Sequence, residues 1–200
     1  MAPRYAELHC LSNFSFQRGA SHAEELVERA QRLGYAAIAI TDECSLAGIV
    51  RAHVAAKEYG IKLIVGAELS FADGLRVALL APDREAYGDL SQLISQGRRQ
   101  AEKGHYRLER DQLAALSSRL LALWLPDSPP SLPDGHWLAK YFAGRAWVAV
   151  ELHYGSRDKA RLRELQAAAE ACGLRCTAAG DVHMHDASRQ ALQDVLTAIR

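Results

Sequence analysis

The chain has 200 residues, of which 49% are hydrophobic, so it is long enough to bury a core of its own. Lysine plus arginine and aspartate plus glutamate each number 24, which excludes the cationic surplus typical of a dedicated duplex-binding module. The sequence has neither a signal-peptide core nor a run of about 18 apolar residues, so we expect a cytoplasmic protein with no membrane partner. The four cysteines lack metal-knuckle spacing and are expected to be reduced thiols.

The chain opens with a strand pattern over residues 5–10, followed by a polar loop. Ser21 is predicted to be a helix N-cap, with Glu24 three residues later completing a capping box. Apolar residues then recur at helical spacing, and Gly34 ends this helix.

The alternation of strand and helix continues through the first half of the chain. Residues 35–41 form a continuous apolar run, as expected for a parallel strand covered on both faces. A helix over residues 46–59 and a strand over residues 61–69 follow, and this order predicts right-handed βαβ units. A strand over residues 75–81 and a polar helix over residues 83–103 continue the pattern.

Residues 126–135 contain four of the six prolines, and we expect a surface loop there. After this loop we expect a helix, a strand, a helix, a strand and a last helix, over residues 137–142, 147–153, 156–172, 174–179 and 187–199. The last helix has no stop signal. We therefore expect residues 1–200 to be a single domain and an N-terminal fragment of a longer protein.

Carboxylates and imidazoles lie at the ends of four of the predicted strands, and parallel strands would bring them to one rim. These residues are His9, Asp42, Glu43, Glu68, Asp181 and His183. Asp181 and His183 point the same way if the backbone is extended. Nitrogen and oxygen donors suit zinc, manganese or iron, which activate water and hold phosphate. Each residue alone has an ordinary alternative: a strand-end histidine is often structural, and Asp42 or Asp186 can be a helix cap.

Four stretches, taken in chain order, resemble the successive motifs of the PHP (polymerase and histidinol phosphatase) domain. They are residues 5–16, 39–48, 60–68 and 180–183. Within that family the chain is most similar to the N-terminal domain of bacterial C-family DNA polymerase alpha subunits, in the error-prone, ImuC-like branch. The resemblance implies a distorted (β/α)7, TIM-like barrel with its metal cleft at the carboxyl ends of the strands.

The sequence departs from the metal-binding members of that family at several ligand positions. His9 is present, but the second histidine of the usual His-x-His pair is Leu11. An expected acidic ligand falls at Arg18, and a histidine expected after the second strand is Glu43. A histidine expected on the strand after Glu68 is Arg76. The resemblance therefore leaves a vestigial or single-metal set, with Glu43 as a substitute ligand: His9, Glu43, Glu68, Asp181 and His183.

Two carboxylates about 4 Å apart repel by roughly 4 kcal/mol at an effective dielectric constant of 20. Crowded acids in such a cleft need positive charge from a metal or from arginine. We hypothesise that Arg18 and Arg76 pair with these acids and replace lost ions, the alternative being that both arginines point into solvent. The sequence leaves open whether His105 or His153 contributes to the cleft.

Two functions compete. The first is a degenerate PHP domain with a structural or partner-binding role, inactive by itself as a phosphoesterase, in an error-prone DNA polymerase. The resemblance then implies translesion synthesis after DNA damage, with the rest of the polymerase chain, accessory mutagenesis proteins, the sliding clamp and DNA as partners through the parent. The second is an active metal-dependent phosphoesterase or 3′–5′ exonuclease. We therefore expect either no cofactor or one divalent zinc or manganese ion at partial occupancy, and we assign no catalytic residue. A third function, a free-standing phosphatase, is disfavoured because the motifs are more similar to those of polymerases.

Overall fold

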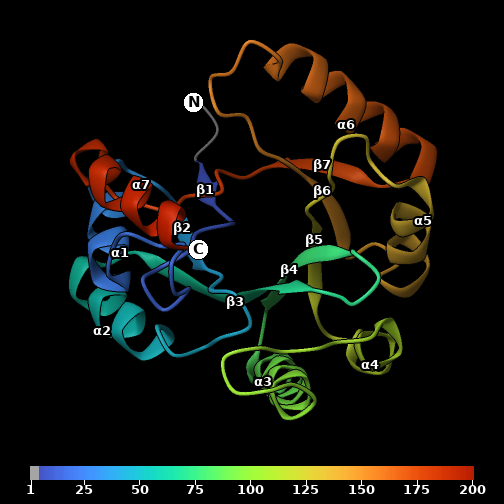
Figure 1. Cartoon of the computed structure of the whole chain (residues 1–200), viewed down its shortest axis with the longest axis horizontal. Helices are drawn as coiled ribbons and strands as arrows, with labels where there is room; N and C mark the ends of the chain where they lie inside the picture. The colour runs from blue at the N-terminus through green and yellow to red at the C-terminus, as the bar shows by residue number, and fades with distance from the viewer. Residues whose placement is uncertain (1–4) are drawn as a thin grey trace. The chain divides into compact units, whose positions relative to one another are not determined.

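The computed structural model describes residues 5–200 (Figure 1). Its seven strands form one hydrogen-bonded sheet in chain order, β1 to β7, with helices in the connections. The predicted α/β class is thus confirmed, and the strand count and order are those of a (β/α)7 barrel. The chain forms two compact units, one made of residues up to 67 together with 181–200, and the other of residues 68–180.

The first unit contains β1, α1, β2, α2, the beginning of β3, a 3-10 turn η1 and α7. Their bounds are β1 (Ala6–Glu7), α1 (Ala23–Arg32), β2 (Ala37–Ile40), α2 (Ile49–Tyr59), β3 (Lys62–Ser70), η1 (Ala187–Arg189) and α7 (Gln190–Ile199). The pairs β1–β2 and β2–β3 are parallel, as predicted from the βαβ pattern. Helices α1 and α2 pack on β2 through small and branched side chains, including Leu26, Val27, Ile38, Ile40 and Ala52.

The last segment of the chain joins the residues that follow β1 through backbone hydrogen bonds. Cys10 and Val182 form a parallel bridge. The Leu11 amide donates to the Val182 carbonyl at 2.8 Å, and the Val182 amide donates to the His9 carbonyl at 3.0 Å. These bonds fix the backbone around residue 182 against the residues that directly follow β1.

The predicted N-cap of α1 is wrong by one residue. His22 is the N-cap, and its amide donates to the Glu25 carboxylate at 2.8 Å. Ser21 instead accepts from the His185 amide at 2.9 Å and lies 2.7 Å from His185 Nδ1. Its buried hydroxyl therefore ties the start of α1 to the last segment of the chain, which local sequence rules do not foresee.

The second unit contains the end of β3 and the following elements. Their bounds are β4 (Arg76–Ala81), α3 (Arg84–Arg99), α4 (Arg110–Leu116), β5 (Leu121–Trp124), α5 (Leu132–Tyr141), β6 (Ala146–Val150), α6 (Asp158–Cys172) and β7 (Arg175–Ala178). Asp83 caps α3 as predicted, with its side chain accepting from the Ala86 amide. Strands β5, β6 and β7 run parallel, but β4 is antiparallel to β5.

Strand β4 departs from the parallel arrangement that the common rim requires, because it runs antiparallel to β5. A tight turn joins β3 to β4, in which the Phe71 amide donates to the Leu75 carbonyl at 2.8 Å. Because the turn is so short, the first residue of β4, Arg76, lies at the carboxyl end of β3.

The predicted proline-rich loop is also shorter than expected, because α5 already begins at Leu132. A proline is tolerated in the first helical turn, where no intrahelical amide bond is required. Gly135 in this helix lies where an added Cβ would be 2.5 Å from Cys172 Sγ and 2.8 Å from Trp124 Cζ3. Close contact with α6 and β5 thus requires glycine at this position.

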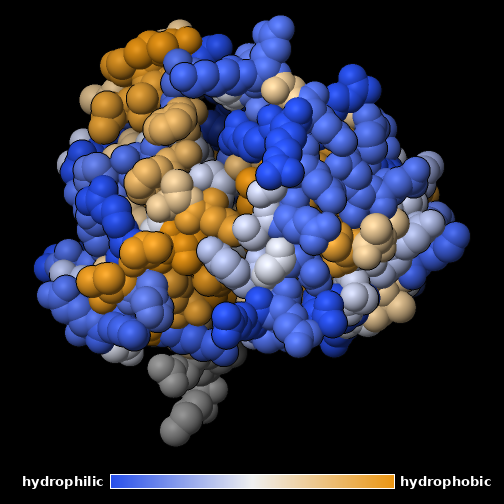
Figure 2. Space-filling model, turned by 90° about the horizontal axis from the view of Figure 1, so that it is seen from below, coloured by the Kyte–Doolittle hydropathy of each residue, from blue (hydrophilic) through white to orange (hydrophobic). Residues whose placement is uncertain are grey.

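Figure 2 shows a mostly hydrophilic surface on which hydrophobic side chains gather in separate patches. Exposed apolar residues of the first unit include Phe16 in a loop, Val50 and Val54 on α2, and three residues of α7. Among residues 5–200, no helix is both long enough and apolar enough to span a membrane.

Candidate functional site

Two imidazoles meet one carboxylate in the first unit. His183 Nε2 lies 3.0 Å from Asp181 Oδ1, and His9 Nδ1 lies 3.6 Å from the same oxygen. His9 is completely buried, while Asp181 and His183 are about a quarter exposed. His9, which is far from the other two in the sequence, is therefore brought together with the neighbouring predicted ligands Asp181 and His183.

Asp181 reaches this position through an unusual backbone. Its φ is 47°, in the left-handed region that residues other than glycine rarely adopt. The prediction of an extended backbone is therefore wrong at Asp181, although its side chain and that of His183 still meet. Strained backbone of this kind is concentrated at functional sites.

An arginine and a glutamate form a second pair in the same unit. Arg18 Nη1 lies 3.0 Å from Glu43 Oε2, and the Arg18 side chain is only 9% exposed. Arg200 Nη2 approaches the same carboxylate oxygen at 3.8 Å. Glu43 is thus held between two guanidinium groups.

A third pair lies in the second unit. Arg76 Nη2 is 3.3 Å from Glu68 Oε1, and the Glu68 side chain is 1% exposed. Arg76 Nη1 also lies 3.7 Å from Asp127 Oδ1. Sequence reasoning missed Asp127 because it assigned residues 126–135 to a surface loop, although Asp127 closely follows the apolar run of β5.

Asp42 is a structural anchor, not a helix cap. Its carboxylate is 1% exposed and accepts hydrogen bonds from the Ser12 amide, the Ser12 hydroxyl and the Ser15 hydroxyl, each at 2.7 Å. Burial raises the pKa of Asp42, and the bonds from the two serines oppose that shift. The other suggested cap is confirmed, because Asp186 accepts from the Ser188 amide at 3.0 Å and begins η1.

Glu7 is a further buried acid that the sequence did not single out. Its Oε1 accepts from the amides of Leu8 and His9 at 2.9 and 3.0 Å, and its Oε2 accepts from the Tyr5 hydroxyl at 2.9 Å. Burial, followed by the charge of Glu7, raises the pKa of Tyr5 well above its ordinary value. Glu7 therefore fixes the backbone that carries His9.

The predicted residues form three groups, which differ in how well they suit a metal. The donors at Asp181, two imidazoles and one carboxylate, have the chemistry of a single zinc or manganese site. Glu43 and Glu68 are instead paired with guanidinium groups, which an ion at either carboxylate would have to displace. By donor type, Asp181 with its two imidazoles suits an ion better than either glutamate does, but no three histidine, cysteine, aspartate or glutamate side chains of residues 5–200 are grouped so as to hold one.

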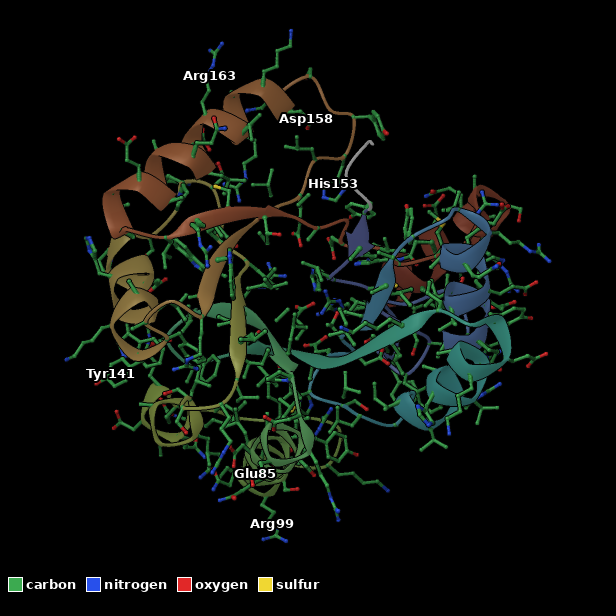
Figure 3. The ribbon with its side chains drawn as sticks, turned by 180° about the vertical axis from the view of Figure 1, so that it is seen from behind. Glu85, Arg99, Tyr141, His153, Asp158 and Arg163 are labelled. Carbon is green, nitrogen blue, oxygen red and sulfur yellow. The ribbon has the colours of Figure 1, made fainter. Side chains whose placement is uncertain are left out.

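The two histidines whose roles the sequence left open both lie in the second unit. His153 lines a cavity of about 320 Å³ between residues 126–128 and α6, together with Glu151, Arg157 and Asp158. Figure 3 shows His153 in the connection from β6 to α6, with Asp158 at the start of that helix. His105 is exposed, and its amide donates to the Glu102 carbonyl at 3.0 Å.

Comparison with known proteins identifies a family and named relatives. The family model described as PHP domain matches residues 7–171. An error-prone DNA polymerase of Dechloromonas aromatica is 57% identical over 203 residues, covering 99% of this chain and 20% of the relative. One from Pseudomonas aeruginosa is 57% identical over 196 residues, covering 98% of this chain and 19% of the relative. The chain spans about a fifth of the curated relatives it matches.

Two solved structures share the fold. An amidohydrolase from Chromobacterium violaceum, with bound sulfate and no metal, has a TM-score of 0.65 at 15% identity, covering 90% of this chain and 87% of that chain. A protein from Bifidobacterium adolescentis, proposed to be a metal-dependent phosphoesterase, has a TM-score of 0.51 at 18% identity, covering 90% and 88%. At these identities the likeness concerns the fold alone.

Proposed function

The chain belongs to the PHP domain family, and from this premise we propose that it serves as the PHP domain of an error-prone DNA polymerase. In this proposal the metal site is degenerate and the domain has a structural or partner-binding role. Nucleotidyl transfer belongs to the remainder of the polymerase, since the chain spans about a fifth of its polymerase relatives. The polymerase would work in the cytoplasm, in translesion synthesis after DNA damage.

The observation that carries this proposal is that two arginines, at positions that match lost ligands, each pair with a glutamate of the remaining ligand set. Arg18 lies 3.0 Å from Glu43, and Arg76 lies 3.3 Å from Glu68. A buried carboxylate is costly without a positive partner, and arginine offers planar, permanently charged donors. We infer that these arginines supply the charge that metal ions supply in metal-binding members of the family.

Metal rescue tests the charge replacement directly. Arg76→Ala should lower the melting temperature, and added Mn²⁺ or Zn²⁺ should restore part of the loss, because the ion replaces the guanidinium at Glu68. Arg99→Ala, an exposed arginine on α3, is the matched control and should show neither effect. Equal stabilisation of the unaltered protein and Arg76→Ala by these ions would contradict the proposal.

Metal content and hydrolysis test the degenerate site itself. Protein purified without chelator should contain less than stoichiometric metal and should hydrolyse bis-p-nitrophenyl phosphate no faster than Asp181→Asn. A variant that restores family ligands, Leu11→His with Arg76→His, should bind more metal than the unaltered protein. Stoichiometric metal in the unaltered protein, with hydrolysis that Asp181→Asn abolishes, would refute degeneracy.

That opposite result would establish the second candidate function, a single-metal phosphoesterase or 3′–5′ exonuclease. The grouping of His9, Asp181 and His183 favours it, because these residues would hold the ion. When bound, such an ion lowers the pKa of its water and neutralises phosphate charge. Glu7, which accepts from the His9 amide, would position that ligand.

The partners follow from the same proposal. The rest of the polymerase chain is the direct partner, since the relatives are several times longer than this chain. Accessory mutagenesis proteins, the sliding clamp and DNA would be reached through the full polymerase. Co-purification of these proteins with the full polymerase but not with residues 1–200 would support that arrangement.

A further inference from the structure

Helix α7 carries an apolar stripe that its own unit does not cover. Leu192, Val195 and Ile199 recur at spacings of three and four residues, so they lie along one side of the helix. They are 41%, 54% and 63% exposed. No residue of α7 is buried, in contrast to α2, which has exposed valines but buries its opposite face.

Polar contacts attach α7 to its unit beside this stripe. Gln193 Nε2 lies 3.4 Å from His183 Nδ1, and Arg200 Nη2 lies 3.8 Å from Glu43 Oε2. Arg189, just before the helix, donates to Glu25 at 2.6 Å. These bonds hold the helix in place through polar groups and leave its apolar side chains outward, where burial against a partner would be favourable.

We propose that the stripe of Leu192, Val195 and Ile199 is the docking site for the polymerase polypeptide that directly follows residue 200. This rests on the proposed function, because it requires a longer polymerase chain. About four-fifths of each matched relative lies outside the aligned region, so a polymerase of that length has a large additional part that can pack against this domain. A segment that leaves Arg200 begins next to Ile199, and such tethering gives a high effective concentration at the stripe.

A second copy of this chain is a poorer occupant. Stable dimers bury about 800 Å² on each partner. Three side chains on a ten-residue helix offer a smaller surface than that. A tethered segment needs less buried area, because it loses less translational freedom on docking.

Site-specific photocrosslinking in the full-length polymerase tests the proposal. Benzoylphenylalanine replaces Val195 in one sample and Val54 on α2 in the other, a matched control with 61% exposure. Mass spectrometry then maps the crosslinked peptides. Val195 should crosslink within the same chain to a peptide beyond residue 200, with a yield several-fold above that from Val54.

Two outcomes would overturn the inference. Equal yields at Val195 and Val54 would mean that the stripe is not covered, and a crosslinked dimer would assign the stripe to a second copy. Primer extension by the unaltered full-length protein is measured in parallel and reports on the proposed function. If the protein extends primers but does not form the intramolecular crosslink, the docking site is refuted while the proposed function stands.

Discussion

Arg76, the first residue of β4, places its guanidinium 3.3 Å from the carboxylate of Glu68, which is 1% exposed and lies near the end of β3. The pair spans the tight turn between two adjacent strands. A carboxylate that is almost fully removed from water thus has a permanent positive charge beside it.

Breaking this pair should destabilise the protein. Arg76→Ala is expected to lower the free energy of unfolding by about 1–3 kcal/mol, less than for a fully buried pair because Arg76 is 37% exposed. Urea denaturation of Arg76→Ala, Glu68→Gln and the double variant gives the coupling energy. Strict additivity of the two single changes would show that the ion pair does not stabilise the protein.

Asp42 should have a pKa above the ordinary value of an aspartate, because burial raises it. A carboxyl group whose folded pKa exceeds the unfolded value binds protons more readily in the folded state. Its contribution to the free energy of unfolding therefore falls as pH rises from about 3.9 to the raised pKa, and is constant above it. Carbon-13 NMR of the Asp42 carboxyl measures the midpoint, and a midpoint at or below 3.9 would contradict the raised pKa.

Gly19 should not tolerate a side chain. An added Cβ would lie 2.0 Å from the Ser12 carbonyl oxygen and 2.3 Å from its carbon, both of which belong to the backbone. Gly19→Ala is expected to cost at least about 3 kcal/mol of unfolding free energy. Gly88→Ala is the control, because Gly88 lies inside α3 with no atom within 4 Å of its Cβ position. That change should stabilise the helix by about 0.5–1 kcal/mol, and similar melting temperatures for both variants would refute the clash.

Ser21 should hold the last segment of the chain against α1. Ser21→Ala removes the acceptor of the His185 amide and is expected to cost about 1–2 kcal/mol, since the hydroxyl is buried. Hydrogen exchange should become faster over residues 183–189, where the amides depend on this anchor. Ser95→Ala, whose exposed hydroxyl bonds within α3, should leave exchange in those residues unchanged. Unchanged exchange in Ser21→Ala would show that the remaining contacts suffice.

The sequence by itself determined the α/β class and most helix and strand positions. The apolar run over residues 37–40 and the helical spacing over α1 are local patterns, and such patterns predict a strand and a helix without reference to the rest of the chain. Asp83 was recognisable as a cap for the same reason, because its bond to Ala86 spans only three residues. Glu68 and Asp181 were recognised as members of a possible site because each lies at the end of an apolar strand pattern.

Only the tertiary structure decided which charged groups meet. The tight turn that follows β3 brings Arg76 to Glu68, and the neighbouring strand β5 runs antiparallel to β4. The left-handed backbone at Asp181, the role of Ser21 as a partner of His185, and the contact of Asp127 with Arg76 likewise depend on residues distant in the chain. Local propensity cannot specify such contacts, because each depends on the packing of elements that are separated in the sequence.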